Sequence, residues 1–352
     1  MPIALNWYED AEEFDTKKLL ALEFQKLGLQ TRVRGPLLTA SAGREKCQLL
    51  EAETCFTALT AFRILKDKRL ARAAFKRAGV SFAEGKTFKL SNKESAREKV
   101  IEFGNAVVKP FDGNKGRGVS VNVTPATFDE AWKAALQSVT THILVEKCFT
   151  GGSEARYLVV DSQCVAVANR VPPFLIGNGI DTVSQLIAAK NNIRSNNPHL
   201  RDRPIIIDEY RKLILSSQKL DLSSIPERGR KVTVDWKSNA STGGETTEIT
   251  DIVHPSMKRI AERVARTIQG LHVGGIDILA NDHTSKATAS NYIVIEANTR
   301  PDLGIHLFPM YGRPVNVSKI IAESCIKHMG LVGARPPVAE TYGRLESMIT
   351  VT

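Results

Sequence analysis

The 352-residue sequence predicts a globular fold that mixes helices and strands, α+β or α/β, and two observations support this prediction. Stretches with apolar residues at helical spacing alternate along the chain with short runs rich in β-branched residues. Hydrophobic residues make up 42% of the chain and charged residues 24%, as in ordinary globular proteins. A chain of this length can bury a sizeable core, so we expect one multi-lobed enzyme unit.

Helices are expected wherever apolar positions recur every three to four residues. A glycine ends several of these stretches, as is typical of helix C-termini. The expected helices are 16–27, about 56–78, 91–103, 125–138, 255–269 and about 315–329.

Strands are expected where short apolar runs lie between turn residues. The expected strands are 106–110, 142–146, 156–160, 164–169, 275–279 and 292–296. Residues from about 176 to 245 are rich in Asn, Ser, Arg and Pro and are interpreted as a partly ordered insertion or lid.

The net charge of +10 points to anionic partners, but the basic residues are scattered among acids. This pattern favours small anionic substrates such as nucleotide phosphates over nucleic acid. The five cysteines are odd in number and form no CxxC pair, which argues for reduced thiols rather than disulfides or a cysteine zinc site. Without a signal peptide or a run of about 20 apolar residues, we expect a cytoplasmic protein with no membrane partner.

A candidate phosphate site follows the strand that ends in Lys109-Pro110. The lysine would project a fixed cation, and a loop containing Gly113, Gly116 and Gly118 would bring backbone N–H groups close to phosphate oxygens. The loop lacks the GKS/T ending of a Walker motif, and a plain glycine-rich turn is the alternative.

Acidic side chains at the ends of apolar strands form a candidate metal site. Asp277 lies inside one strand, and Glu296 and Asn298 close another. Converging oxygen ligands suit Mg²⁺. Two alternatives remain open: Asp277 could pair with a buried arginine, and Glu296 and Asn298 could cap a loop.

A third candidate site is a pair of acids, Glu146 and Glu154. A Gly-Gly turn separates them, and they could reach an adenine amino group and a ribose diol. Solvated acids at strand ends are the alternative for both.

The order and spacing of these residues resemble those of ATP-grasp enzymes. Asp67-Lys68 stands where that family supplies a second phosphate-binding lysine. Later motifs are similar to those of cyanophycin synthetases and of the ATP-grasp module of bifunctional glutathione synthetases. These motifs are Arg170-Val171-Pro172, 176–183, 239–244, Thr250-Asp251 and His254-Pro255.

The resemblance implies an ATP-grasp fold, in which two α+β lobes grip ATP behind a short N-terminal pre-ATP-grasp segment. The implied divisions are 1–64 for that segment, 65–142 for the first lobe, 143–330 for the second lobe with its lid, and 331–352 for the tail.

The resemblance also implies roles for the candidate residues. Lys68, Lys109 and the glycine loop would hold phosphates, Glu146 and the backbone near Cys148 would meet adenine, and Glu154 would meet the ribose. Asp277, Glu296 and Asn298 would hold two Mg²⁺ ions, for which Mn²⁺ is a substitute.

For the chemistry, Arg156 and Arg170 are the expected donors to a tetrahedral oxyanion, with Arg300 as a third candidate. Ser241 to Gly244 would bind the carboxylate substrate. A structural salt bridge is the alternative for each arginine.

The implied function is ligation of a carboxylate to an amine through an acyl phosphate, with ADP and phosphate released. Amino acids or short peptides are the expected substrates, and a homodimer follows only by family analogy. Alternatives are a glutathione-synthetase-like ligase acting on a γ-glutamyl peptide, a small-molecule kinase and a nucleotide-binding regulator without turnover.

This chain departs from its relatives at three places. Residues 194–199 replace a glycine-bearing turn that precedes a histidine in the relatives. Lys115 replaces a histidine, and Asp235 and Lys237 lie where the relatives carry a Leu-Arg pair. We therefore expect a substrate of different charge.

Overall fold

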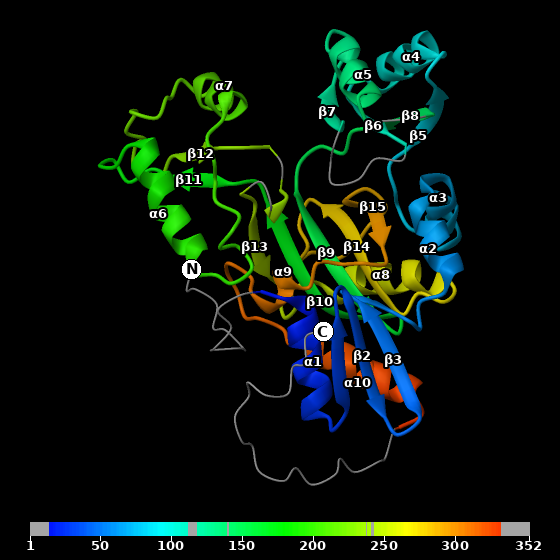
Figure 1. Cartoon of the computed structure of the whole chain (residues 1–352). Coiled ribbons are helices and arrows are strands. Elements are labelled where there is room, and N and C mark those ends of the chain that lie inside the picture. Colours follow the sequence, from blue (N-terminus) through cyan, green and yellow to red (C-terminus); the bar gives the residue numbers. More distant parts are fainter. Residues whose placement is uncertain (1–13, 112–117, 139–140, 237, 241–242, 332–352) are drawn as a thin grey trace.

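The computed structural model describes residues 14–111, 118–138, 141–236, 238–240 and 243–331 (Figure 1). Its centre is a five-stranded antiparallel sheet with the strand order β13-β10-β9-β14-β15. These strands are β9 (Ser153–Val160), β10 (Gln163–Val171), β13 (Glu245–Glu248), β14 (Val273–Ala280) and β15 (Tyr292–Asn298). Antiparallel sheets packed with helices confirm the α+β prediction.

The two faces of this sheet differ because successive side chains of a strand point in opposite directions. On β9, Ala155, Tyr157 and Val159 pack against the helix α8 (Pro255–Thr267) in one hydrophobic cluster. Leu158 and Val160 face the other way and join a second cluster with α10 (Val317–His328).

Glu154 and Arg156 lie on the same face as Leu158 but at the other end of the strand. One face of the central sheet is therefore apolar under α10 and charged toward the N-terminal end of β9.

A second sheet lies above the central one in Figure 1 and has the order β5-β8-β6-β7. Helices α4 (Lys93–Phe103) and α5 (Phe128–Leu136) pack on it. Its strands are β5 (Gly85–Lys89), β6 (Ala106–Pro110), β7 (Ser120–Val123) and β8 (His142–Lys147). The expected helices and strands of this region are confirmed.

The N-terminal region contains a sheet that the sequence patterns did not predict. Helix α1 (Thr16–Lys26) leads into an antiparallel meander that packs on α1 and shares a hydrophobic cluster with α10. Its strands are β1 (Gln30–Arg34), β2 (Leu37–Ala42), β3 (Glu45–Leu50) and β4 (Glu53–Thr54).

The helical stretch expected over about 56–78 is divided into two helices. The chain forms α2 (Leu59–Lys66) and α3 (Lys68–Arg77), separated at Asp67. The Asp67 side chain accepts hydrogen bonds from the backbone N–H groups of Arg69 and Leu70, and this N-cap starts the new helix.

The segment from about 176 to 245, the expected insertion or lid, contains helices and strands among its described residues. Strands β11 (Phe174–Ile176) and β12 (Lys231–Thr233) pair, and α6 (Val183–Ser195) and α7 (Glu209–Ser217) pack beside them. These elements share their own hydrophobic cluster, which contains Leu175, Val183, Leu215 and Val232. The remaining described helix is the short α9 (Gly304–Leu307).

Within the described part of the chain, no helix is long and apolar enough to cross a membrane.

Candidate active site

The charged side chains of the central sheet lie in register across three strands. Arg156 of β9 pairs with Asp277 of β14, which in turn pairs with Glu296 of β15. Directly opposed residues of antiparallel strands carry side chains on the same face, with Cβ atoms about 5 Å apart. The sheet register therefore brings together residues that lie 121 positions apart in sequence.

Asp277 is bound by two arginines. Arg156 donates from Nε and Nη2 to the two carboxylate oxygens at 2.8 and 2.7 Å, and Arg170 Nη2 lies 2.9 Å from Oδ2. Burial opposes ionisation of Asp277, but the two guanidinium groups hold its pKa below the usual range. The carboxylate also raises the pKa of Arg156, although burial of that guanidinium opposes its charge. Asp277 is thus a permanent anion among cations.

Arg170 and Glu154 extend this cluster along the sheet. They are opposed in the register of β9 and β10, and Arg170 Nη2 donates to Glu154 Oε1. The other oxygen of Glu154 accepts a hydrogen bond from Ser238 Oγ at 2.7 Å. Ser238 lies directly before the motif 239–244, which is expected to bind the carboxylate substrate. Glu154 therefore connects this loop to the charged row of the sheet, which consists of Arg156, Asp277 and Glu296.

Glu296 and Asn298 lie at the edge of the same cluster. The Glu296 side chain is exposed, and Asn298 Oδ1 is buried without a hydrogen-bond partner among the described residues. Asp277 uses three of its roughly four acceptor positions. Two carboxylates and an unpartnered amide oxygen are a donor set that fits Mg²⁺.

The second sheet contributes Lys109 and Glu146, which form a buried ion pair. They are diagonal neighbours on β6 and β8, because Glu146 is opposed to Val107. The other carboxylate oxygen of Glu146 accepts a hydrogen bond from Arg72 Nη1 at 2.5 Å. Arg72 belongs to α3 and was not predicted, although it lies one helical turn after Lys68 on the same helix face.

Lys68 begins α3 and is half-buried. Gly118 has a φ of +67°, and a Cβ there would lie 2.9 Å from Pro110 Cγ, so only glycine fits this end of the glycine loop. The backbone N–H of Cys148 donates to the carbonyl of Asn105 at 3.0 Å, which leaves the Cys148 carbonyl as its candidate contact to adenine. Gly113, Gly116, Lys115, Lys237 and Ser241 lie outside the described residues.

The substrate loop is held by a buried arginine of the lid. Arg194 Nη1 donates to the carbonyls of Gly243 and Gly244, and Nη2 donates to the carbonyl of Ala240, all at 3.1 Å. Nε and Nη2 also donate to the carbonyl of Arg203. Burial lowers the pKa of Arg194 to about 10, so the side chain stays charged at neutral pH. A Cβ on Gly244 would lie 2.3 Å from the Ser238 carbonyl oxygen, so this turn requires glycine.

Asp235 has a different role from the one that its sequence context suggested. Its Oδ2 accepts two hydrogen bonds from Arg211 of α7, at 3.1 and 2.8 Å, and both residues are buried. Arg211 therefore neutralises the carboxylate that this chain carries at position 235. Asp235 no longer supports the expectation of a substrate of different charge.

Arg300 is not brought together with the other two arginines. Its Nη2 lies 2.8 Å from Glu51 Oε2 in the turn between β3 and β4, and both side chains are about half exposed. For this residue the structure favours the salt-bridge alternative.

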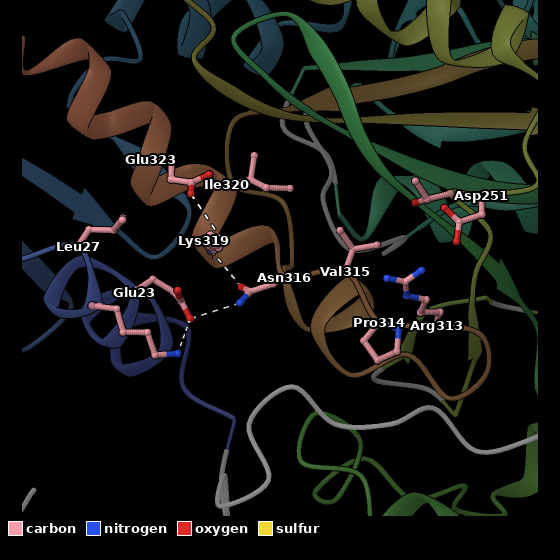
Figure 2. A pocket seen from close by; sticks show the side chains of 12 residues that line it. Glu23, Leu27, Asp251, Arg313, Pro314, Val315, Asn316, Lys319, Ile320 and Glu323 are labelled. Carbon is pink, nitrogen blue, oxygen red and sulfur yellow. Dashed lines mark hydrogen bonds and ion pairs between the residues drawn. The ribbon is translucent and has the colours of Figure 1, made fainter. Parts of the chain in front are cut away.

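A pocket of about 770 Å³ lies elsewhere, between α1, the residues 250–251, the residues 313–316 and α10 (Figure 2). It contains none of the candidate site residues. Glu23 lies on one wall and is bonded to Lys26 and Asn316.

The chain is similar to known proteins in sequence and in fold. No family model matches the chain. It is 28% identical to a glutathione biosynthesis bifunctional protein of Clostridium perfringens over 316 residues, which cover 87% of this chain and 40% of that protein. It is 32% identical to the cyanophycin synthetase of Nostoc sp. over 271 residues, which cover 76% of this chain and 30% of that protein.

Among solved structures, a bifunctional glutathione synthetase from Pasteurella multocida superposes with a TM-score of 0.69 at 24% identity, covering 90% of this chain and 44% of that one. The chain spans less than half the length of each of these relatives. The superposition shows the fold, and the sequence relatives show the family: the chain belongs to the ATP-grasp ligase family.

Proposed function

We propose that this protein is an ATP-dependent carboxylate–amine ligase that forms an amide between amino acids or short peptides. The observation that carries the proposal is the charged row of the central sheet, in which Asp277 and Glu296 lie beside Arg156 and Arg170. Such a row can neutralise a triphosphate and a developing oxyanion at one place.

In this proposal, Lys68 and Lys109 bind phosphates, Glu146 and the Cys148 backbone bind adenine, and Glu154 binds the ribose. Lys109 and Glu146 neutralise each other until nucleotide arrives, and Arg72 keeps Glu146 in position when Lys109 turns to a phosphate. Asp277, Glu296 and Asn298 would hold two Mg²⁺ ions, which neutralise phosphate charge when bound.

The reaction has two steps. A substrate carboxylate oxygen attacks the γ-phosphorus, the bond to the bridging oxygen breaks, and ADP leaves. The amine of the second substrate then attacks the acyl carbon, loses a proton, and expels phosphate. In this proposal, Arg156 and Arg170 donate hydrogen bonds to the oxyanion of the tetrahedral intermediate. Gly244 and its loop, held by Arg194, would bind the carboxylate substrate.

The bonds between Glu154, Ser238 and Arg170 support a link between the two substrate sites. A carboxylate that binds the loop would lie beside the same arginine that neutralises Asp277. Positioning of this kind supplies much of the acceleration in phosphoryl transfer.

An ADP-release screen over pairs of amino acids and short peptides tests the function. We expect release above background only when the correct acid and amine are both present, and a product mass equal to their sum minus water. The Glu296→Gln variant is the matched control and should show no such release. Phosphate transferred to a hydroxyl, or no release for any pair, would contradict the proposal.

Isotope transfer tests the intermediate. A substrate carboxylate labelled with ¹⁸O should deliver one ¹⁸O atom to the released phosphate, because the attacking oxygen leaves with phosphorus. Unlabelled phosphate from a productive reaction would exclude an acyl phosphate.

A further inference from the structure

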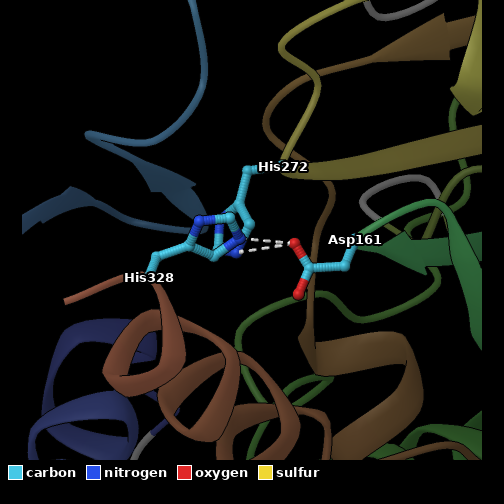
Figure 3. Close-up of side chains that lie close together, drawn as sticks. All are labelled: Asp161, His272 and His328. Atoms are coloured by element: carbon cyan, nitrogen blue, oxygen red, sulfur yellow. Dashed lines mark hydrogen bonds and ion pairs between the residues drawn. The ribbon is translucent and has the colours of Figure 1, made fainter. Parts of the chain in front are cut away.

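Three side chains meet at the end of the central sheet away from Glu154 and Arg156 (Figure 3). Asp161 lies in the turn between β9 and β10, His272 lies directly before β14, and His328 is the last residue of α10. Asp161 is five residues after Arg156, a separation of about 16 Å along an extended strand. The cluster is therefore separate from the proposed nucleotide site.

The three side chains offer two imidazole nitrogens and a carboxylate oxygen to one point. Asp161 Oδ1 lies 2.6 Å from His328 Nε2 and 3.7 Å from His272 Nε2. The ligand atoms of the three residues all lie within 4.8 Å of one another. Ligands about 2.0–2.1 Å from a tetrahedral ion are separated by about 3.4 Å, so small side-chain shifts would complete such a site.

The surroundings orient both imidazoles. Thr54 Oγ1 lies 2.6 Å from His272 Nδ1, which directs the opposite nitrogen, Nε2, toward Asp161. The Phe56 ring stacks on His328 with centroids 5.0 Å apart. Ser324 Oγ lies 2.7 Å from His272 Nε2 and donates to Asp161 Oδ2 at 2.6 Å, so a fourth candidate ligand atom, a hydroxyl oxygen, is within reach.

The cluster is buried on one side and open to solvent on the other. The His272 side chain is buried, and the Asp161 side chain is about one-third exposed. The His328 side chain is 41% exposed, so an ion can enter from solvent.

We propose that Asp161, His272 and His328 form a binding site for one divalent transition-metal ion of the Zn²⁺ class. Two imidazoles and one carboxylate favour such ions over Mg²⁺, which prefers oxygen ligands alone. The ion joins the turn of the central sheet to the end of α10, and Thr54 connects it to the N-terminal meander. Its role is to stabilise this junction.

Titration of the metal-free full-length protein with Co²⁺, in excess Mg²⁺ and without nucleotide, tests the site. We expect one Co²⁺ per chain, visible d–d bands of a four-coordinate ion, no thiolate-to-metal band, and displacement by Zn²⁺. Zinc should also raise the melting temperature, because it binds the folded state.

Matched variants keep the test specific. His328→Gln and Asp161→Asn should each abolish the d–d bands, and Thr54→Val should weaken binding about 10- to 100-fold by freeing His272 to rotate. His142→Gln, on the second sheet, should bind like the wild type. A wild-type protein without stoichiometric Co²⁺ binding, or wild-type binding by both ligand variants, would overturn the proposal.

Discussion

The charged face of the central sheet and the lid both bury arginines, but they use them differently. On the sheet, Arg156 and Arg170 face the carboxylate of Asp277 at the edge of a site with an exposed acid, Glu296. In the lid, Arg194 donates to backbone carbonyls and Arg211 pairs with Asp235 inside the fold. The charged side chains of the sheet lie where a ligand could form new ion pairs with them. Those of the lid form contacts within the lid itself.

This difference suggests a division of labour. Under the proposed function, the sheet would provide electrostatic stabilisation for phosphoryl transfer, and the lid would hold Ala240, Gly243 and Gly244 of the proposed substrate loop in place. Substitutions in the two regions should therefore separate catalysis and nucleotide binding from binding of the carboxylate substrate.

Asp277→Ala should have the largest effect. It leaves two buried arginines without their carboxylate, which should cost about 3–5 kcal/mol of unfolding free energy and abolish ATP turnover. Urea denaturation and the ADP-release assay measure the two effects. Glu94→Gln, which changes an exposed pair on α4, is the control and should leave both unchanged. A stable Asp277→Ala protein with normal turnover would contradict the role of the sheet.

Arg194→Leu should have an intermediate effect of a different kind. Several carbonyls of the loop lose their donor, so the unfolding free energy should fall by about 2 kcal/mol. The KM for the carboxylate substrate should rise about tenfold, because the substitution removes the hydrogen bonds that hold the loop. The affinity for ADP should stay within about twofold of the wild-type value, because Arg194 does not contact the described residues of the proposed nucleotide site. Arg194→Lys should restore part of the affinity. Equal losses of nucleotide and substrate binding would remove the distinction between the two regions.

Arg211 and Asp235 should show the smallest net effect when changed together. Each single change, Arg211→Met or Asp235→Leu, leaves a buried charge, whereas the double variant removes both. A double-mutant cycle in urea should give a coupling energy of about 2 kcal/mol, with substrate preference unchanged in the double variant. A changed substrate preference would show that Asp235 acts on the substrate after all.

Much of this architecture could be predicted because its signals are local. The helix over 91–103 and the strand over 106–110 carry clear apolar spacing, and the structure confirms both. Asp277 drew attention because a carboxylate in an apolar strand needs a partner. Its alternative reading, a pair with a buried arginine, is what the structure shows, and this pairing is compatible with a metal-binding role that remains a prediction.

Other features needed long-range information. The three loop carbonyls that accept hydrogen bonds from Arg194 lie 46–50 residues away in sequence, so no local pattern predicts that Arg194 holds this loop. The cluster of Asp161, His272 and His328 combines residues from a turn, the segment just before a strand and the end of a helix, which lie far apart in sequence. The cysteine pattern gave no information about it, because it contains no cysteine. For the N-terminal meander, by contrast, the sequence does contain a local signal, namely Gly35 and Gly43. Both glycines have positive φ in the structure and lie in the hairpin turns between short strands.

The most direct test of the account is whether nucleotide binding depends on Mg²⁺ through Glu296. Calorimetric titration of ADP into the wild type should show a large gain in affinity when Mg²⁺ is added, and the gain should vanish in Glu296→Gln, whose melting temperature should match the wild type because the side chain is exposed. If the variant keeps the full Mg²⁺-dependent gain, or if the wild type shows none, the charged row of the central sheet is not the nucleotide–metal site.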